Sequence, residues 1–348
     1  MLVTGAAGLI GGEVCARLAA RGHGVTAMVR KVREVRGNDG AQVAGATVVD
    51  GDVTRPLMGL DPAAFDIDLV IHCAASLEFD APRDVLAAVN VEGTRNAVEF
   101  AGAAGAGFVH VSTAYVCGTR EGVIAEGPVL AGTRFTNNYE ASKAQAEAAV
   151  AESGLPFVVA RPSIVLGDHA TGEIRDFPSL CNVFRLMARG KVGTFPARSN
   201  STLDLVPVCH VAEGIVRLAE RFGNASGGYY HLVADTPLPA AELARGVARV
   251  AHFPDPQVVD PDSFDADSLR PAERMLLGRM MATFGAYFTR SPRFDDSRFG
   301  NVTGLACPPT DAAWLDRLIA YGIERGYLPQ APVSERRDNA CPAAAARP

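Results

Sequence analysis

The glycine-rich segment near the N-terminus constrains the fold more than any other part of the sequence. It reads Thr4-Gly5-Ala6-Ala7-Gly8-Leu9-Ile10-Gly11, between an apolar run at 2–4 and a helical pattern that extends to about Ala20. The first glycine allows a tight turn, the second lets a backbone approach a pyrophosphate, and the third lets the helix pack closely on the strand. The start of the helix supplies free N–H groups for the anion. This context predicts a dinucleotide-binding turn rather than an ordinary tight turn, with contacts from Gly5, Gly8, Leu9, Ile10 and Gly11.

The first half of the chain alternates apolar runs with helical patterns. Strands are predicted at 2–4, 24–29, 46–50, 67–72, 107–112 and 157–161. Helices are predicted from the end of the glycine-rich turn at Gly12 to about Ala20, and at about 82–103 and 137–152. The strands are almost continuously apolar, as expected when helices cover both faces of a sheet. Repeated strand–helix units predict a Rossmann-type, doubly wound parallel sheet of the α/β class.

After Pro162, helical patterns dominate and proline and glycine become frequent. Helices are predicted at 178–189, 208–222, 239–250, 268–288 and 311–325, and short strands at 201–206 and 228–232. We expect a cofactor domain at 1–162, to which 203–235 returns, and a smaller, mainly helical substrate lobe at 163–202 and 236–329. Residues 330–348 carry alanine, proline and charge without periodicity, which predicts a disordered tail.

Composition excludes several classes of protein. A net charge of −6 argues against a nucleic-acid binder, which is usually basic. The seven cysteines show no CxxC spacing, so neither a metal site nor a disulfide framework is predicted. We find no secretory signal and no apolar run of the roughly 18 residues needed to span a bilayer. A soluble chain with reduced thiols and a cytoplasmic location is the expectation.

The end of the second predicted strand selects the coenzyme. An NAD enzyme usually carries Asp or Glu there, to hold the ribose 2′-hydroxyl. This chain has Arg30 and Lys31, with Arg33 and Arg36 close behind. A cationic fork suits a 2′-phosphate, so NADP(H) is predicted with Arg30 as the main contact. A solvated basic helix start is the alternative.

Small and polar residues follow other strands at the same edge of the predicted sheet. Asp52, next to Val53, follows the third strand, where a carboxylate can accept a hydrogen bond from the adenine amino group. A turn aspartate is the alternative. Ala74 and Ala75 end the fourth strand, where small side chains let the coenzyme lie close. His110, in a core strand, is expected to be a satisfied interior residue.

The catalytic candidates form a Y-x-x-x-K motif on a predicted helix. Tyr139 and Lys143 are four residues apart and therefore share a helix face. A fixed lysine cation near the nicotinamide favours the phenolate and so lowers the tyrosine pKa from about 10. Tyr139 can then donate a proton to a carbonyl oxygen as hydride reaches its carbon, while Lys143 holds the ribose hydroxyls. Thr113, at the end of the fifth strand, can polarise the same carbonyl, with Ser112 as the alternative.

These motifs, in this order, resemble the extended short-chain dehydrogenase/reductases over about residues 1–235. The matching segments are 4–11, Asp52-Val53, Asn90-Val91-Glu92-Gly93-Thr94, Ser112-Thr113-Ala114-Tyr115-Val116, Tyr139 with Lys143, and Arg161-Pro162-Ser163. The resemblance implies a catalytic triad of Thr113, Tyr139 and Lys143. It also implies that Pro162, Ser163 and Ile164, together with Ser112, pass near the nicotinamide. A homodimer through the helices at 82–103 and 137–152 is expected on the same basis.

Other segments resemble one branch of that family, the fatty acyl-CoA reductases and thioester-reductase domains. They are residues 110–116, residues 161–168 and Tyr287-Phe288 with Phe294-Asp295. That branch reduces an acyl thioester, on coenzyme A or a carrier protein, to an aldehyde or alcohol. The resemblance therefore implies an NADPH-dependent acyl-thioester reductase. The apolar side chains of helix 268–288 then either line an acyl channel or lid, or pack as ordinary core.

Two other hypotheses stay open. The first keeps the enzyme class and changes the substrate, to a steroid- or flavonoid-type ketone, another aldehyde, or a nucleotide sugar in an epimerase or dehydratase. Arg30 counts against an epimerase, which usually holds NAD, whereas basic residues in the second half could contact a nucleotide sugar: Arg185, Arg189, Lys191 and Arg198. The second is a coenzyme-binding scaffold or redox sensor without catalysis.

Overall fold

A computed structural model describes residues 1–32, 34–79 and 81–331. Arg33, one of the cations considered for the 2′-phosphate, lies outside the described residues. So does all of the expected tail except Gln330 and Ala331.

Seven parallel strands form the central sheet, in the order β12-β7-β5-β4-β1-β2-β3. They are β1 (Leu2–Thr4), β2 (Val25–Val29), β3 (Ala46–Asp50), β4 (Leu69–His72), β5 (Gly107–Val111), β7 (Phe157–Pro162) and β12 (Gly228–Leu232). The strand order reverses between β1 and β4, and ligands of such sheets bind outside the carboxyl ends of the strands at this point. The predicted Rossmann-type α/β fold is confirmed.

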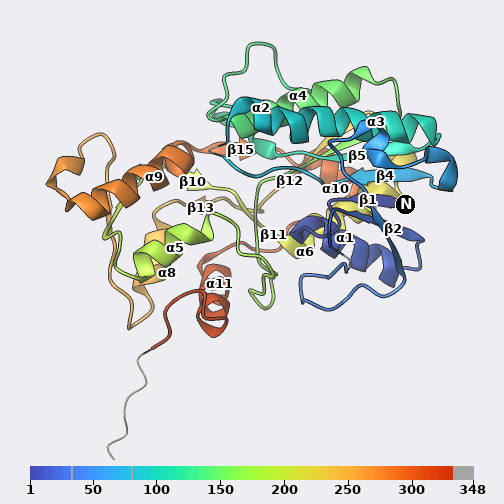
Figure 1. Ribbon diagram of the computed structural model, residues 1–348. Helices are drawn as coiled ribbons and strands as arrows, with labels where there is room; N and C mark the ends of the chain where they lie inside the picture. The colour runs from blue at the N-terminus through green and yellow to red at the C-terminus, as the bar shows by residue number, and fades with distance from the viewer. Residues whose placement is uncertain (33, 80, 332–348) are drawn as a thin grey trace, which may run out of the picture.

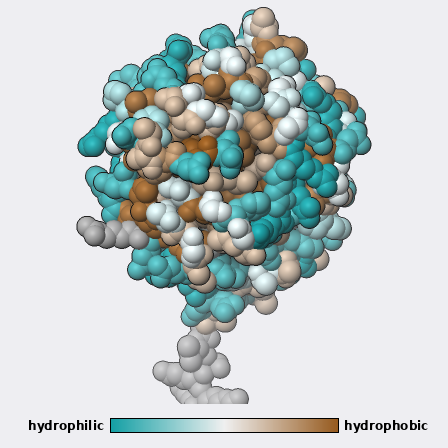
Figure 2. Space-filling model, turned by 90° about the vertical axis from the view of Figure 1, so that its right-hand side faces the viewer, coloured by the Kyte–Doolittle hydropathy of each residue, from teal (hydrophilic) through white to brown (hydrophobic). Residues whose placement is uncertain are grey.

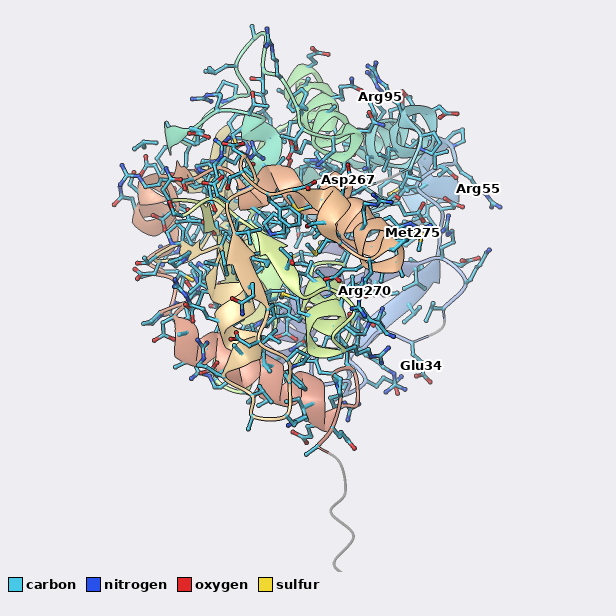
Figure 3. The ribbon with its side chains drawn as sticks, turned by 90° about the vertical axis from the view of Figure 1, so that its left-hand side faces the viewer. Glu34, Arg55, Arg95, Asp267, Arg270 and Met275 are labelled. Carbon is cyan, nitrogen blue, oxygen red and sulfur yellow. The ribbon has the colours of Figure 1, made fainter. Side chains whose placement is uncertain are left out.

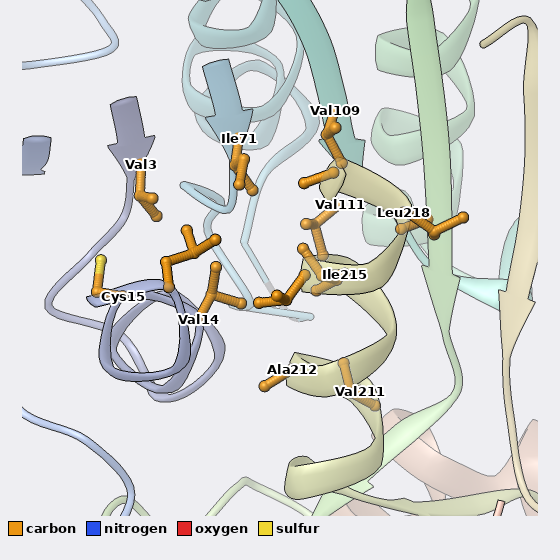
Figure 4. Close-up of a cluster of buried hydrophobic side chains, with 14 of the residues drawn as sticks. Val3, Val14, Cys15, Ile71, Val109, Val111, Val211, Ala212, Ile215 and Leu218 are labelled. Carbon is orange, nitrogen blue, oxygen red and sulfur yellow. The ribbon is translucent and has the colours of Figure 1, made fainter. Parts of the chain in front are cut away.

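Helices α1 (Leu9–Ala20) and α6 (Val208–Glu220) lie together on one face of the sheet (Figure 1). Val14 of α1 and Ile215 of α6 share a buried cluster with Val3 and Ile71 of the sheet (Figure 4). Each such side chain contributes roughly 1.5–3 kcal/mol when fully buried. This packing holds the start of α1 against the carboxyl end of β1.

The opposite face carries α3 (Gly93–Ala103) and α4 (Asn138–Glu152), whose buried side chains pack with those of the sheet. The sequence predicts one helix over 82–103, but the structure divides it into α2 (Arg83–Leu86), the π-helical segment η3 (Ala87–Glu92) and α3. Asn90 explains the interruption, because its buried side chain binds groups outside the helix. Wider turns of this kind often occur at functional sites.

A second buried cluster lies beside the sheet domain and is centred on Trp314, Phe195 and Phe288. Its helices are α5 (Cys181–Ala188), α8 (Glu242–Ala248), α9 (Pro271–Phe288) and α11 (Ala312–Glu324). Two short helices, α7 (Phe222–Ala225) and α10 (Ser297–Thr303), pack instead with the buried cluster of the central sheet, through Ala225 and Phe299. In α9, Leu277 and Phe288 pack as core, whereas Met275 is 52% exposed (Figure 3).

Four short strand pairs in the described part of the chain connect segments that are distant in the sequence. Of these strands, the sequence predicted only the part within 201–206. They are β6 (Gly122–Ile124) with β15 (Pro292–Phe294), β8 (Ile164–Leu166) with β11 (Leu205–Pro207), β9 (Thr194–Pro196) with β14 (Gln257–Val259), and β10 (Thr202–Leu203) with β13 (Leu238–Pro239). Single 3₁₀ turns are η1 (Pro56–Gly59), η2 (Pro62–Ala64), η4 (Ala114–Cys117) and η5 (Ala266–Ser268).

Hydrophilic and hydrophobic side chains are interspersed over the face shown in Figure 2. Among the described helices, none has the length and apolar character needed to cross a membrane.

Candidate active site

The glycine turn between β1 and α1 has the open backbone that a pyrophosphate requires. Gly5 has a φ of 64°, and a Cβ there would lie 2.7 Å from the nitrogen of Ala74. A Cβ on Gly11 would lie 2.3 Å from the carbonyl oxygen of Gly5, so this close packing of helix and strand requires glycine. Gly8 is exposed, and α1 begins at Leu9 without a side-chain cap. The turn therefore fits a dinucleotide phosphate.

The cations after β2 face two different neighbours. Arg30 is 60% exposed, and its Nη1 lies 3.8 Å from Oδ2 of Asp52. Asp52 forms the turn considered as the alternative, because its Oδ1 accepts hydrogen bonds from the backbone N–H and hydroxyl of Thr54. These bonds, the backbone one first, hold the pKa of Asp52 below its usual value. Lys31, in contrast, lines a hollow beside Ala7 of the glycine turn.

Of the residues predicted after β3 and β4, Ala74 lies against Gly5 of the glycine turn, whereas Val53 lies against α3. Val53 is buried, and its carbonyl accepts a hydrogen bond of 2.8 Å from Asn96 of α3. The N–H of Ala74 donates to Thr4 Oγ1 at 3.2 Å, and Ala75 follows, half-buried.

The residues predicted after β7 lie at the same edge of the sheet. Pro162 ends β7 and is buried, as is Ser163, whose N–H donates to the carbonyl of Leu232. Ile164 is half-buried and begins β8. In the first turn of α1, Ile10 is half-buried as well.

Helix α4 brings the tyrosine and the lysine to the carboxyl end of β5. Both side chains are buried, with 8% of Tyr139 and 1% of Lys143 exposed. Lys143 Nζ donates a 2.8 Å hydrogen bond to the carbonyl of Val111, the last residue of β5. Thr113 follows two residues later. The structure thus places the lysine and the threonine at the same strand end, with Tyr139 one helical turn before the lysine.

Aromatic side chains form an apolar wall beside Tyr139. Its ring centroid lies 5.0 Å from that of Phe79, in the segment that follows β4. Phe79 also lies 6.1 Å from Phe284 of α9. Leu86 of α2 belongs to the same small buried cluster. An acyl or other apolar group could pack against this wall.

The two adjacent hydroxyls after β5 differ in their partners. Thr113 Oγ1 accepts a 3.2 Å hydrogen bond from the N–H of Tyr115 and thereby caps η4. Ser112 is 4% exposed, and its hydroxyl has no hydrogen-bond partner within the described residues. A buried polar group without a partner is costly, so a bound molecule that bonded Ser112 would remove this cost.

Burial shifts the pKa values of the two helix residues in opposite directions. It lowers the pKa of Lys143 to about 8, although the nearby carboxylate of Glu147 opposes this change. It raises the pKa of Tyr139, and Glu140 adds to the increase. The sequence predicts a lowered tyrosine pKa, whereas the pKa of the buried phenol is raised in this structure, because burial disfavours the charged phenolate. Tyr139 is therefore protonated at neutral pH, as a proton donor must be.

Asn90 links two parts of the site. Its Oδ1 accepts a 2.7 Å hydrogen bond from the N–H of Ser76, and its Nδ2 donates to the hydroxyl of Ser142 at 2.9 Å. The segment after β4 is thereby held against α4. Asn90 lies within a motif that the sequence analysis identifies, but its partners could not be read from the sequence.

A buried contact that the sequence analysis did not predict connects α9 to the start of α4. The hydroxyl of Tyr287 donates to Glu140 Oε1 at 2.8 Å, and Arg290 lies 3.5 Å from the same oxygen. Glu140 follows Tyr139 directly and is fully buried. The burial of Glu140 depends on its tertiary neighbours, so the sequence alone could not indicate it.

Comparison with known proteins supports the same family. A family model for NAD-binding domains, described as male sterility protein, matches residues 3–215. Fatty acyl-CoA reductase 1 of Arabidopsis thaliana is 25% identical over 246 residues, 53% of this chain and 50% of that protein. Aldehyde reductase lnaA of Aspergillus flavus is 24% identical over 320 residues, 80% of this chain and 30% of that protein. The chain therefore spans half or less of the length of these two relatives.

Two further matches extend over nearly the whole chain. Sterol demethylase protein B of Methylococcus capsulatus is 29% identical over 342 residues, 94% of this chain and 99% of that protein. The crystal structure of the terminal R domain from the myxalamid PKS-NRPS biosynthetic pathway superimposes with a TM-score of 0.82 at 25% identity. This superposition covers 95% of this chain and 92% of that one.

Proposed function

Because the chain belongs to the male sterility protein family, a group of NAD(P)-dependent oxidoreductases within the extended short-chain dehydrogenase/reductases, we propose that it reduces acyl thioesters with NADPH. The observation that carries the proposal is the buried Tyr139 and Lys143 at the end of β5, with the apolar wall of Phe79 and Phe284 beside the phenol. Such a wall suits an acyl chain better than a sugar. The structural similarity to the terminal R domain over most of both chains favours the same substrate class.

The proposed chemistry requires one proton donor and one oxygen-binding group. When bound, the reduced nicotinamide supplies a hydride to the thioester carbonyl carbon. Tyr139 donates its phenolic proton to the carbonyl oxygen, and Thr113 donates a hydrogen bond to the same atom. The resulting hemithioacetal loses its thiol and leaves an aldehyde. Each turnover thus consumes one thioester, one NADPH and one proton.

In this scheme Lys143 positions the ribose of the coenzyme and does not transfer a proton. Its Nζ already donates to Val111 and has two further hydrogens with which to hold the ribose hydroxyls. NADPH rather than NADH is proposed because Arg30 and Lys31 stand where an NAD enzyme carries an acidic residue. We further propose that 163–202 and 236–329 form the substrate lobe.

A ketone reductase is the second candidate. The match to sterol demethylase protein B over nearly the full length of both chains favours a sterol-type substrate, and the aromatic wall would also accept a flat apolar ring system. A nucleotide sugar is disfavoured by the positions of the basic residues. Arg198, for example, pairs with Asp262, and Arg185 stacks over Tyr327.

The test is a substrate panel with a matched tyrosine control. NADPH and NADH oxidation is followed with acyl-CoAs of several chain lengths, the corresponding aldehydes, sterol ketones and UDP-sugars, and aldehyde products are trapped with a hydrazine. We expect NADPH-dependent aldehyde formation from thioesters, lost at least 100-fold in Tyr139→Phe and unchanged in Tyr321→Phe, which lies on α11. Turnover of ketones alone would replace the thioester proposal with the second candidate.

A further inference from the structure

The segment between β8 and α5 crosses to the coenzyme side of the molecule. The backbone N–H of Arg175 donates to Asn38 Oδ1 at 3.1 Å, and Asn38 Nδ2 donates to the carbonyl of Glu173 at 2.8 Å. Asn38 is buried and lies in the loop that follows β2. A segment from the second half of the chain is therefore fixed to the loop that follows the predicted coenzyme-selecting strand.

The guanidinium of Arg175 bridges two loops of the predicted coenzyme site. Nη2 donates to the carbonyl of Ala7 in the glycine turn at 2.8 Å, and Nη1 donates to the carbonyl of Arg36. The side chain is only 15% exposed. A Cβ on Gly12 would lie 2.2 Å from the carbonyl oxygen of Arg36, so this loop passes directly over the start of α1. Arg175 thus sets the separation between the glycine turn and the loop after β2.

An open hollow of about 520 Å³ lies beside this bridge. Its charged lining consists of Lys31, Glu34, Arg36, Arg175 and Asp176, and Ala7 forms part of its wall. Glu34 pairs with Arg36 at 2.6 Å, and Asp176 with Arg175 at 2.8 Å. Lys31 forms no ion pair with any described residue, so one positive charge is uncompensated among the described residues that line the hollow.

The backbone at Lys31 is also unusual. Its φ is 71°, in the left-handed region that residues other than glycine rarely adopt. Such strain persists only where the surrounding structure imposes it, and it is concentrated at functional sites. The conformation brings Lys31, rather than Arg30, to the hollow beside the glycine turn.

We infer that Arg175 is a positioning residue for coenzyme selection. By joining the glycine turn to the loop after β2, it shapes this hollow, in which Lys31, one of the predicted contacts of the 2′-phosphate, is the free cation. Arg175 acts through the two loops that it joins, because its own N–H groups are already directed at carbonyls and at Asp176. The inference rests on the proposed use of NADPH. It adds a specificity determinant that lies 144 positions beyond Lys31, outside any motif for coenzyme selection.

Calorimetric titration of the whole protein with 2′,5′-ADP and with 5′-AMP tests the inference, because the two probes differ in the 2′-phosphate. We expect Arg175→Ala to weaken 2′,5′-ADP binding at least tenfold and 5′-AMP binding less than twofold. The KM for NADPH should rise while kcat stays within twofold. Arg221→Ala is the matched control, since Arg221 also donates to the carbonyl of a distant segment, at Val302, away from this site. If Arg175→Ala does not fold, Arg175→Lys, which keeps the charge but cannot bridge both loops, should lose at least threefold for 2′,5′-ADP only.

The outcomes distinguish a failure of the role inferred for Arg175 from a failure of the proposed use of NADPH. Equal weakening of both probes, or no weakening of either, would overturn the role of Arg175 while leaving NADPH use intact. A wild-type protein that binds both probes equally would contradict NADPH selection itself, and the inference with it. Neither result would affect the thioester test.

Discussion

At the residue scale, burial acts in opposite directions on the pKa values of Tyr139 and Lys143, the two buried residues proposed for catalysis. Burial raises the pKa of the tyrosine and lowers that of the lysine to about 8. The phenol therefore keeps the proton that a reduction consumes, whereas the ammonium is close to losing its own. The protonation state of Lys143, not that of Tyr139, should limit activity on the alkaline side.

The pH dependence of kcat/KM tests this expectation. The lysine is charged below its pKa of about 8 and neutral above it, so activity should be flat near pH 6–7 and fall as pH rises through about 8. Lys143→Arg should shift this fall to higher pH, because arginine stays protonated. If activity falls at the same pH in Lys143→Arg as in the wild type, the group that titrates there is not Lys143.

The adjacent hydroxyls give a second prediction at this scale. Thr113→Val should lower kcat at least 100-fold, because the substrate oxygen loses one donor. Ser112→Ala should change kcat less than about fivefold and act mainly on coenzyme KM. Single-turnover rates and coenzyme titrations of both variants measure these two effects. A large loss of kcat in Ser112→Ala with a small one in Thr113→Val would assign the catalytic role to Ser112.

At this scale, the sequence identified the residues of the family motifs but not their hydrogen-bond partners. Asp52 could be placed after β3, yet only the structure shows its turn with Thr54. His110 is interior as expected, but its ring nitrogens have no partner among the described residues, contrary to the expectation of a satisfied histidine. Hydrogen-bond partners depend on tertiary approach, for which the sequence carries no local signal.

At the scale of elements, the long apolar strands and amphipathic helices were predictable because their patterns are local. The predicted bounds of β3 match the structure, and β12 appears at 228–232 as predicted. Helix α1 ends at Ala20 as predicted, but it begins at Leu9, within the segment that was expected to be the glycine-rich turn. The three-residue strands β6 and β15 could not be predicted, because each exists only through pairing with a partner some 170 positions away. The π-helical turn at η3 was missed for the same reason, since Asn90 is held by Ser76 and Ser142.

The ion pair between α4 and β7 is the element-scale prediction. Arg161 and Glu147 are 3% and 2% exposed and form two parallel hydrogen bonds, of 2.9 and 2.6 Å. Removing one partner leaves a buried charge, so Glu147→Gln or Arg161→Met should lower the free energy of unfolding by about 3–5 kcal/mol. The exposed pair of Arg95 and Glu92 is the control, where Arg95→Ala should cost less than about 1 kcal/mol. Urea unfolding followed by circular dichroism measures both, and equal costs would contradict the argument.

At the scale of the whole molecule, the two buried clusters meet where the chemistry is proposed. Tyr115, two residues after Thr113, belongs to the cluster centred on Trp314 rather than to the sheet domain. Tyr287 joins α9 to the first turn of α4 across 147 positions. The two buried clusters are therefore joined through the ends of β5 and α4, an arrangement that no local pattern reveals.

The prediction at this scale concerns Asp204, because the burial of its carboxyl makes the free energy of unfolding depend on pH. Burial raises the pKa of this carboxyl to about 7. Between the unfolded value of about 4 and this value, the folded protein binds more protons than the unfolded chain, so stability contributed by this group falls as pH rises from about 4 to 7. Asp204→Asn keeps an acceptor for the N–H of Ala234 and removes the charge.

The free energy of unfolding in urea is therefore compared between wild type and Asp204→Asn at pH 5 and pH 8. The difference should move in favour of the variant by a few kcal/mol at the higher pH, at about 1.4 kcal/mol per unit of pKa shift. A difference that is constant between the two values would show that Asp204 does not titrate in this range.

The most direct test of the central claim follows one deuterium atom. Purified protein is incubated with NADPH deuterated at the nicotinamide C4 and with an acyl-CoA, and the trapped aldehyde is analysed by mass spectrometry alongside the released thiol. The account predicts an aldehyde with one deuterium at C1 and an equal amount of free coenzyme A, both reduced at least 100-fold in Tyr139→Phe. Deuterium that enters a ketone substrate but never an aldehyde derived from a thioester would contradict the thioester reductase and leave a ketone reductase in its place.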